Sequence, residues 1–305
     1  MDFTKSFVRA KNPCADGFRW YLRHHQDGSD YQQVLDDLVR DGRVQDACWL
    51  LDQLGPTHTL LQLDRIDCDA LVFAGSIEVR GGIESASVLR AGGSIRCGGM
   101  LRVGGAVVAG QDVKADGGLR TCGDLRCGGA LLAGWHTSIA GSLSAGELKV
   151  RGDLRCSGSL AVERAARIDG DLLVEGEGAA RSLWSRGSVH ATGTLRVAQG
   201  LICGADVECG GHLDAGWGIK AGGDVIAAGA IRAGEGIAAA GDIRAGQGYG
   251  IFAGLCVQRE AWDSSARVTA QAEPKGLMSG FWTGAEAGPA SRPGDTVVAE
   301  VLHAN

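Results

Sequence analysis

The chain has 305 residues and a formal net charge of −6, and 45% of its residues are hydrophobic while only 5% are aromatic. Its 50 glycines accompany only five prolines and follow no Gly-X-Y period, which excludes collagen, and the hydrophobic share excludes a wholly disordered chain. The acidic balance argues against a nucleic-acid-binding protein, because such a protein needs a clustered positive surface.

Residues 1–56 predict a small helical domain. Asp16 can cap a first helix, and Ser29 with Gln32 forms a capping box before a second helix that ends at Gly42. A third apolar segment follows and stops at a Gly-Pro pair. Such a domain could cover the open end of the structure that follows it, and a dedicated recognition module is an equally good interpretation.

A six-residue repeat dominates the middle of the chain. The consensus is G-[DS]-[IVL]-R-A-G, in which a small residue comes two positions after each aliphatic one. Alternation within each unit sends the aliphatic and the small residue to one side, as in a short β-strand closed by a Gly-rich corner. Two unbroken runs carry the aliphatic residue: Ile77, Ile83, Leu89, Ile95, Leu101, Val107, Val113, Leu119, Leu125 and Leu131, then Val189, Leu195, Leu201, Val207, Leu213, Ile219, Val225, Ile231, Ile237 and Ile243.

These units predict an all-β solenoid. Three of them would make one coil, which gives a three-sided β-helix with roughly 18 residues per coil and about ten coils. We expect the β-helix over residues 57–256, between the helical N-terminal domain and an irregular C-terminal cap at 257–305. Within this cap, 267–270 and 296–299 predict strands, with a long loop before the second. The handedness of the coil stays open.

An 18-residue coil also predicts which outward side chains stack. Asp206, Asp224 and Asp242 would form a column of like charges, which backbone amides or a cation must offset. Two further columns are expected, Arg196–Asp214–Arg232 and His190–Glu208–Ile226–Arg244.

The positions of the cysteines indicate a structural role and not a metal-binding or redox role. No CxxC pair occurs among the ten, and six occupy the small inward position of the repeat, which suits a buried small hydrophobic residue. We therefore expect no metal site and no cofactor. The N-terminal residues resemble no secretory signal and no apolar run reaches about 18 residues, so we expect a cytoplasmic protein outside the membrane. The six inward cysteines are Cys68, Cys97, Cys127, Cys156, Cys203 and Cys209.

The repeat loses its register at Thr137 and regains it fully from Val189. We interpret residues 135–188 as an interruption that protrudes as a loop from one face, and such loops often carry binding residues. Tryptophan and arginine are the residue types that favour interface hot spots. The candidate partner-binding residues are therefore Trp135, His136, Arg167, Trp184 and Arg186.

Units such as 223–229 and 241–246 resemble the repeats of bactofilins, the bacterial β-helix proteins that form polymers. This resemblance covers roughly residues 70–255 and implies a scaffold that polymerises end to end. Structured-looking segments stand here in place of the flexible tails of that family, which argues against such stacking. The string from Asn12 to Trp20 resembles a short helical module of bacterial effector-linked immunity proteins, which implies a toxin as partner.

No catalytic constellation is evident, because Gly-x-Gly-x-x-Gly matches fall inside the repeat and no nucleophile elbow, HExxH or Walker loop occurs. We expect a non-catalytic solenoid that binds a protein, with an immunity or antitoxin protein as first hypothesis. A self-associating bactofilin-like scaffold is the alternative. A trimeric hexapeptide acyltransferase with His136 as general base is a remote one, since this repeat mostly places Arg or Lys after the aliphatic residue.

Overall fold

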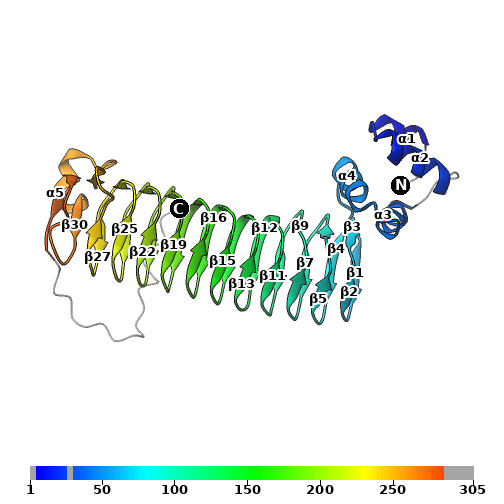
Figure 1. Ribbon diagram of the computed structural model, residues 1–305, viewed down its shortest axis with the longest axis horizontal. Coiled ribbons are helices and arrows are strands. Elements are labelled where there is room, and N and C mark those ends of the chain that lie inside the picture. The colour runs from blue at the N-terminus through cyan, green and yellow to red at the C-terminus, as the bar shows by residue number, and fades with distance from the viewer. Residues whose placement is uncertain (1–4, 26–29, 285–305) are drawn as a thin grey trace.

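The computed structural model describes residues 5–25 and 30–284. It shows a parallel β-solenoid of about 12 turns, with a small group of helices at its N-terminal end (Figure 1). The predicted solenoid is therefore confirmed, with about two turns more than expected. The predicted range 57–256 itself holds about eleven turns, and strands continue beyond it to Trp282.

The strands pair in parallel in three stacks that run along the solenoid. Stack 1 contains β1 (Leu60–Leu63), β4 (Ser76–Val79), β7 (Ile95–Cys97), β10 (Val113–Ala115), β12 (Leu125–Ala133), β14 (Leu143–Val150), β16 (Leu160–Ile168), β18 (Gly178–Ser185), β21 (Leu201–Cys203), β24 (Ile219–Ala221), β27 (Ile237–Ala239), β30 (Arg267–Thr269) and β32 (Phe281–Trp282). Stack 2 contains β2 (Ile66–Cys68), β5 (Ile83–Ser85), β8 (Leu101–Val103), β11 (Leu119–Thr121), β13 (Thr137–Ile139), β15 (Leu154–Cys156), β17 (Leu172–Val174), β19 (Val189–Ala191), β22 (Val207–Cys209), β25 (Val225–Ala227) and β28 (Ile243–Arg244).

Stack 3 contains the first halves of β12, β14, β16 and β18, which span the corner between stacks 3 and 1 without a break. Its other members are β3 (Leu71–Phe73), β6 (Leu89–Ala91), β9 (Val107–Ala109), β20 (Leu195–Val197), β23 (Leu213–Ala215), β26 (Ile231–Ala233), β29 (Ile251–Phe252) and β31 (Leu277–Ser279).

The segment 135–188 is not a protruding loop, so that prediction is wrong. Its strands stay in the three stacks, but some turns are one residue shorter: Thr137 pairs with Leu154, 17 positions on, and Leu154 pairs with Leu172, 18 positions on. The missing residues come from the corner between stacks 3 and 1, where the pairings of β14 show a register shift after Ala145. A corner can lose one residue without altering which side chains of the next strand point inward, and so the solenoid continues.

The interior repeats one arrangement in every turn. The aliphatic residue of each unit is fully buried, and the small residue beside it is buried or nearly so. Five of the six inward cysteines are buried and Cys68 is half-buried, which confirms their structural placement. The Cys203 and Cys209 thiols donate to corner carbonyls at 3.0 Å. Burial raises the pKa of the Cys97 and Cys127 thiols to about 11.

The corners explain why Gly precedes Asp or Ser in the repeat. The Asp206 carboxylate accepts the backbone N–H of Asp224 in the next turn at 2.7 Å, and Asp224 accepts that of Asp242 at 2.8 Å. A Cβ at Gly223 or Gly241 would overlap these carboxylate oxygens, so the position must lack a side chain. Backbone amides thus offset the stacked charges, and the three predicted outward columns are confirmed by the strand registers.

The N-terminal helices are α1 (Lys5–Ala10), α2 (Ala15–His24), α3 (Tyr31–Arg40) and α4 (Val44–Leu54). Two predicted caps are wrong. The Cys14 side chain, and not Asp16, caps α2, and Asp30 caps α3 by accepting the Gln32 N–H at 2.9 Å. Helix α3 ends at Arg40, and the expected glycine, Gly42, follows two residues later with a positive φ of 74°.

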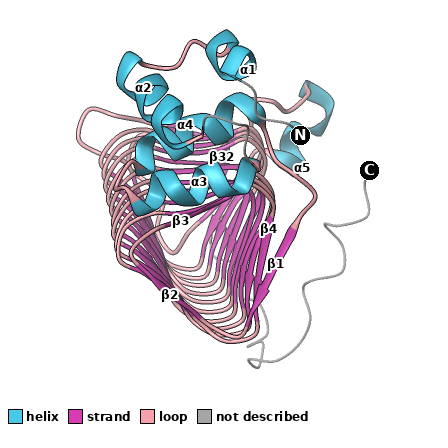
Figure 2. Ribbon diagram, turned by 90° about the vertical axis from the view of Figure 1, so that its right-hand side faces the viewer, coloured by secondary structure: helices cyan, strands magenta, loops and turns pink. Residues whose placement is uncertain are grey.

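These helices cover part of the first turn. In Figure 2 they gather over β3, whereas β2 lies clear of them. The Gln32 side chain takes the place of a neighbouring strand: its amide donates to the Val72 carbonyl at 3.0 Å and accepts the Ala74 N–H at 2.8 Å. Val72 and Ala74 also belong to the helical core cluster. The edge of β3 is therefore paired, as an edge strand requires.

At the other end, β30 and β32 extend stack 1 and β31 extends stack 3, beside the short helices η1 (Arg259–Ala261) and α5 (Trp262–Ser265). The predicted strand at 267–270 is confirmed, and the one at 296–299 lies outside the described residues. No helix in the described part of the chain is long and apolar enough to cross a membrane.

Candidate functional site

The five predicted partner-binding residues lie on stack 1 and on the corner that follows it. Arg167 of β16 and Trp184 of β18 are in register on neighbouring turns, and the guanidinium carbon of Arg167 stands 4.2 Å from the centre of the Trp184 ring. Ile202 flanks Trp184 on the next turn. The structure thus brings Arg167 and Trp184 into a cation–π contact that presents an aromatic surface to solvent.

Trp135 lies two turns from Arg167 and three from Trp184, on the corner between stacks 1 and 2. Its side chain is 66% exposed. The strand registers align it with Gly117 and Gly152 on the neighbouring turns, which have no side chain to cover the ring. Arg186 occupies the same corner and is also exposed. The predicted residues therefore share one edge of the solenoid, but only Arg167 and Trp184 touch.

His136 has a structural contact on this edge. Its Nδ1 accepts the backbone N–H of Asp153 at 3.0 Å, in the way that corner aspartates cap the next turn. The same Nδ1 lies 3.2 Å from the Asp153 carboxylate, so His136 contacts both the backbone and the side chain of that residue. His136 thus connects two successive turns at the corner next to Trp135.

The same edge carries many cations. We define the basic edge as the outer positions of stacks 1 and 2 and of their shared corner, between Arg96 and Arg186. Over five intervals of about 4.8 Å it extends about 24 Å. Its nine cations are Arg96, Arg102, Lys114, Arg120, Lys149, Arg151, Arg155, Arg167 and Arg186, and its four carboxylates are Asp116, Asp153, Asp169 and Asp171.

All four carboxylates already form an ion pair or accept a hydrogen bond within the fold. Asp116 pairs with Lys114 at 3.0 Å and Asp169 pairs with Arg167 at 3.4 Å. Asp153 and Asp171 each accept a backbone N–H of the following turn. Among the described residues, six of the nine cations form no ion pair: Arg96, Arg120, Lys149, Arg151, Arg155 and Arg186.

The opposite side of the same turns has the reverse balance. Stack 3 and its two corners carry the carboxylates Asp112, Asp124, Glu147, Glu163, Glu175 and Glu177 and only the cations Arg126, Arg164 and Arg181. Arg126 pairs there with Asp124 at 3.0 Å. The local net charge is therefore +5 on the basic edge and −3 on the stack 3 side, within a chain of net charge −6.

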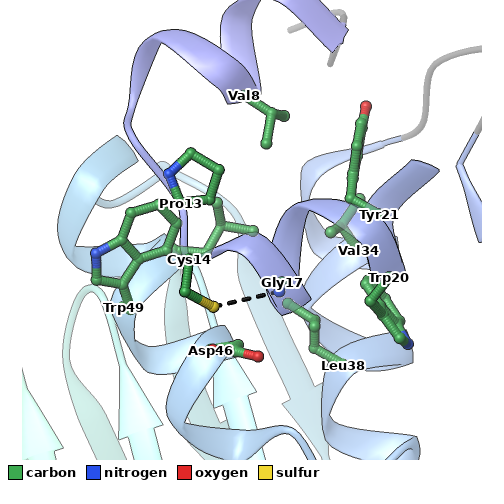
Figure 3. Close-up of a pocket in the computed structure, with 11 residues that line it drawn as sticks. Val8, Pro13, Cys14, Gly17, Trp20, Tyr21, Val34, Leu38, Asp46 and Trp49 are labelled. Atoms are coloured by element: carbon green, nitrogen blue, oxygen red, sulfur yellow. Dashed lines mark hydrogen bonds between the residues drawn. The ribbon is translucent and has the colours of Figure 1, made fainter.

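A second candidate site is a cavity of about 210 Å³ in the helical region (Figure 3). Its lining is mainly apolar and includes Trp20, Tyr21 and Trp49. Asp46 also lines the cavity, but the Arg43 guanidinium binds its carboxylate at 2.7 Å. The cavity suits an apolar group by its chemistry, and nothing in the structure identifies an occupant.

Within the described residues, no group of three or more His, Cys, Asp or Glu side chains could hold a metal ion. The basic edge offers instead a rigid surface with an exposed aromatic ring, a cation–π pair and uncompensated positive charge.

Comparison with known proteins bears on the helical region alone. The family model of the YdhT N-terminal domain matches residues 1–57, which contain the four helices and the residues that line the cavity. No curated protein and no solved structure matches the chain. The similarity to this domain covers less than a fifth of the chain.

Reasoning from the sequence missed the basic edge. The net charge averages the two sides of the solenoid and so hides their opposite signs. The signal was present in the repeat, since the residue after the aliphatic one is Arg or Lys at positions such as 96, 102, 114 and 120. Assigning these positions to stacks would have revealed the asymmetry.

Proposed function

We propose that the chain is a non-catalytic, protein-binding β-solenoid whose partner binds along the basic edge. The exposed Trp135 ring, together with the Arg167–Trp184 pair on the same edge, supports this proposal most strongly. Exposed tryptophan and arginine on a rigid backbone are typical of binding hot spots, and solenoids offer extended binding surfaces. The proposal places the protein in the cytoplasm, where its thiols remain reduced.

The finer proposal is a bacterial immunity or antitoxin protein that covers the active site of a toxin. The resemblance of residues 12–20 to immunity-associated helical modules motivates it. The extent of the edge supports it, since two strand stacks and their shared corner offer a partner a continuous surface about 24 Å long. A rigid surface also loses little conformational entropy on binding, which favours tight inhibition.

The proposal is tested by photo-crosslinking followed by mutation. A photoreactive phenylalanine in place of Trp135 should capture the partner in cells, and the purified partner is then titrated against Trp135→Ala/Trp184→Ala. We expect the double variant to lose at least tenfold in affinity while its unfolding transition stays unchanged. Trp217→Ala is the matched control, because Trp217 is 46% exposed on the corner between stacks 3 and 1. Unchanged affinity in the double variant would contradict this site.

A second candidate is a scaffold that polymerises end to end. It is favoured by the N-terminal edge of stack 1, where β1 pairs with β4 alone among the described residues and its Leu60 and Leu63 side chains are exposed. Light scattering over a dilution series separates the two candidates. Filaments that persist on dilution and are lost in Leu60→Lys/Leu63→Lys would support the scaffold, whereas a particle near 31.5 kDa would exclude it.

A further inference from the structure

We propose that the basic edge recognises an acidic surface of its partner protein. This inference rests on the proposed function and adds the chemistry of the partner. It begins from the six cations of the edge that form no ion pair among the described residues, and from the fact that the four carboxylates of the edge are used within the fold.

Three of the unpaired cations lie on the turns next to Trp135. Arg120 and Arg155 occupy the turns before and after Ser138 in stack 2, since the registers pair Arg120 with Ser138 and Ser138 with Arg155. Arg151 lies on the corner one turn after the Trp135 corner. A partner that covers the Trp135 ring therefore comes close to all three guanidinium groups. Carboxylates at those places would form charge-assisted hydrogen bonds, which arginine makes well in a bidentate geometry.

The stack 3 side would repel the same partner, because its local net charge is −3 over the same turns. The opposed signs would orient an acidic protein toward one side of the solenoid and speed its encounter there. A nucleic acid fits less well, because Asp116, Asp169 and Asp171 interrupt the row of cations and would face its phosphates. An acidic protein surface can place its carboxylates between these positions.

The test uses the full chain and a fluorescent peptide of about 12 residues rich in Asp and Glu, long enough to span the edge. A Gln/Asn peptide of equal length and a single-stranded oligothymidylate are the comparison probes. Binding is followed by anisotropy at low salt and at about 0.3 M salt, where exposed charges are screened. We expect the acidic peptide to bind more tightly than either probe and to weaken about tenfold with salt.

Two variants with the same total charge locate the interaction. Arg120→Glu/Arg151→Glu/Arg155→Glu reverses the edge, and Arg126→Glu/Arg164→Glu/Arg181→Glu makes the same three replacements on the stack 3 side. We expect the first to weaken binding of the acidic peptide at least tenfold and the second to leave it within about twofold. Equal losses in both variants, or no preference of the wild type for the acidic peptide, would overturn the inference.

Tighter binding of the oligothymidylate would likewise overturn it in favour of a nucleic acid. The proposed function is judged separately, by the partner crosslinked at Trp135. If that partner requires Trp135 and Trp184 but binds the edge-reversed variant normally, the protein-binding function stands and the acidic partner is excluded.

Discussion

The basic edge and the stack 3 side belong to the same turns and enclose the same interior. Leu125 faces inward from stack 3 and Leu131 from stack 1, and both are fully buried. Outside, the two sides differ in sign, with +5 on the edge and −3 opposite. The repeat therefore restricts which residues occupy the inward and corner positions. The outward positions are free to differ from turn to turn, so each side of the solenoid can carry its own charge.

The largest expected effect concerns the interior that both sides share. Leu131→Ala should cost about 2–5 kcal/mol of unfolding free energy, because it leaves a cavity in a closely packed stack. Leu125→Ala should cost a similar amount, although it lies on the other side. Denaturant unfolding measures both, and Leu132→Ala, on the outward neighbour of Leu131, is the control with a small effect. A cost as small as that of Leu132→Ala at either inward leucine would contradict the idea of one common interior.

The corners should show the next largest effect. A methyl group at Gly241 would overlap the Asp224 carboxylate, so Gly241→Ala should cost about 1–3 kcal/mol. Asp224→Ala should cost about 1–2 kcal/mol, since the Asp242 N–H loses its acceptor. The two changes should not be additive, because removing the carboxylate also removes most of the overlap. A double-mutant cycle with additive costs would contradict this explanation of the Gly-Asp pair.

The thiols should show an effect that depends on pH. The folded-state pKa of Cys97 and Cys127 is raised to about 11 from a value near 9.0, so the folded protein keeps protons that the unfolded chain releases. Stability should therefore fall as the pH rises from about 9 to 11, and less so in Cys97→Ala/Cys127→Ala. At pH 8 a thiol reagent should modify the exposed Cys122 quickly and these two only after unfolding. Rapid modification of Cys127 in the folded protein would contradict its inward position.

Much of the fold could be predicted from the sequence, because the inward positions repeat a physical requirement every six residues. Helices α2, α3 and α4 were also foreseen and α1 was not, and Gln32 was assigned to a capping box whereas it pairs with β3. Such a long-range contact leaves no local signal. The corners at 146–147 and 181–182 are each one residue short, and the resulting change of period was mistaken for a protruding loop.

The site could be predicted only in part. Trp135, Arg167, Trp184 and Arg186 were chosen by residue type, and the structure places them on one edge because the turns remain in register. His136 was chosen for its chemistry, but its Nδ1 is occupied by the Asp153 N–H. The charge of the edge escaped notice because it emerges only when residues about 18 positions apart are stacked.

The most direct test of the central claim is the affinity of the partner crosslinked at Trp135 for the two charge-reversed variants. We expect Arg120→Glu/Arg151→Glu/Arg155→Glu to weaken binding at least tenfold and Arg126→Glu/Arg164→Glu/Arg181→Glu to leave it within about twofold, although both carry the same net charge. A loss confined to the stack 3 variant, or equal losses in both, would contradict a solenoid that recognises its partner along the basic edge.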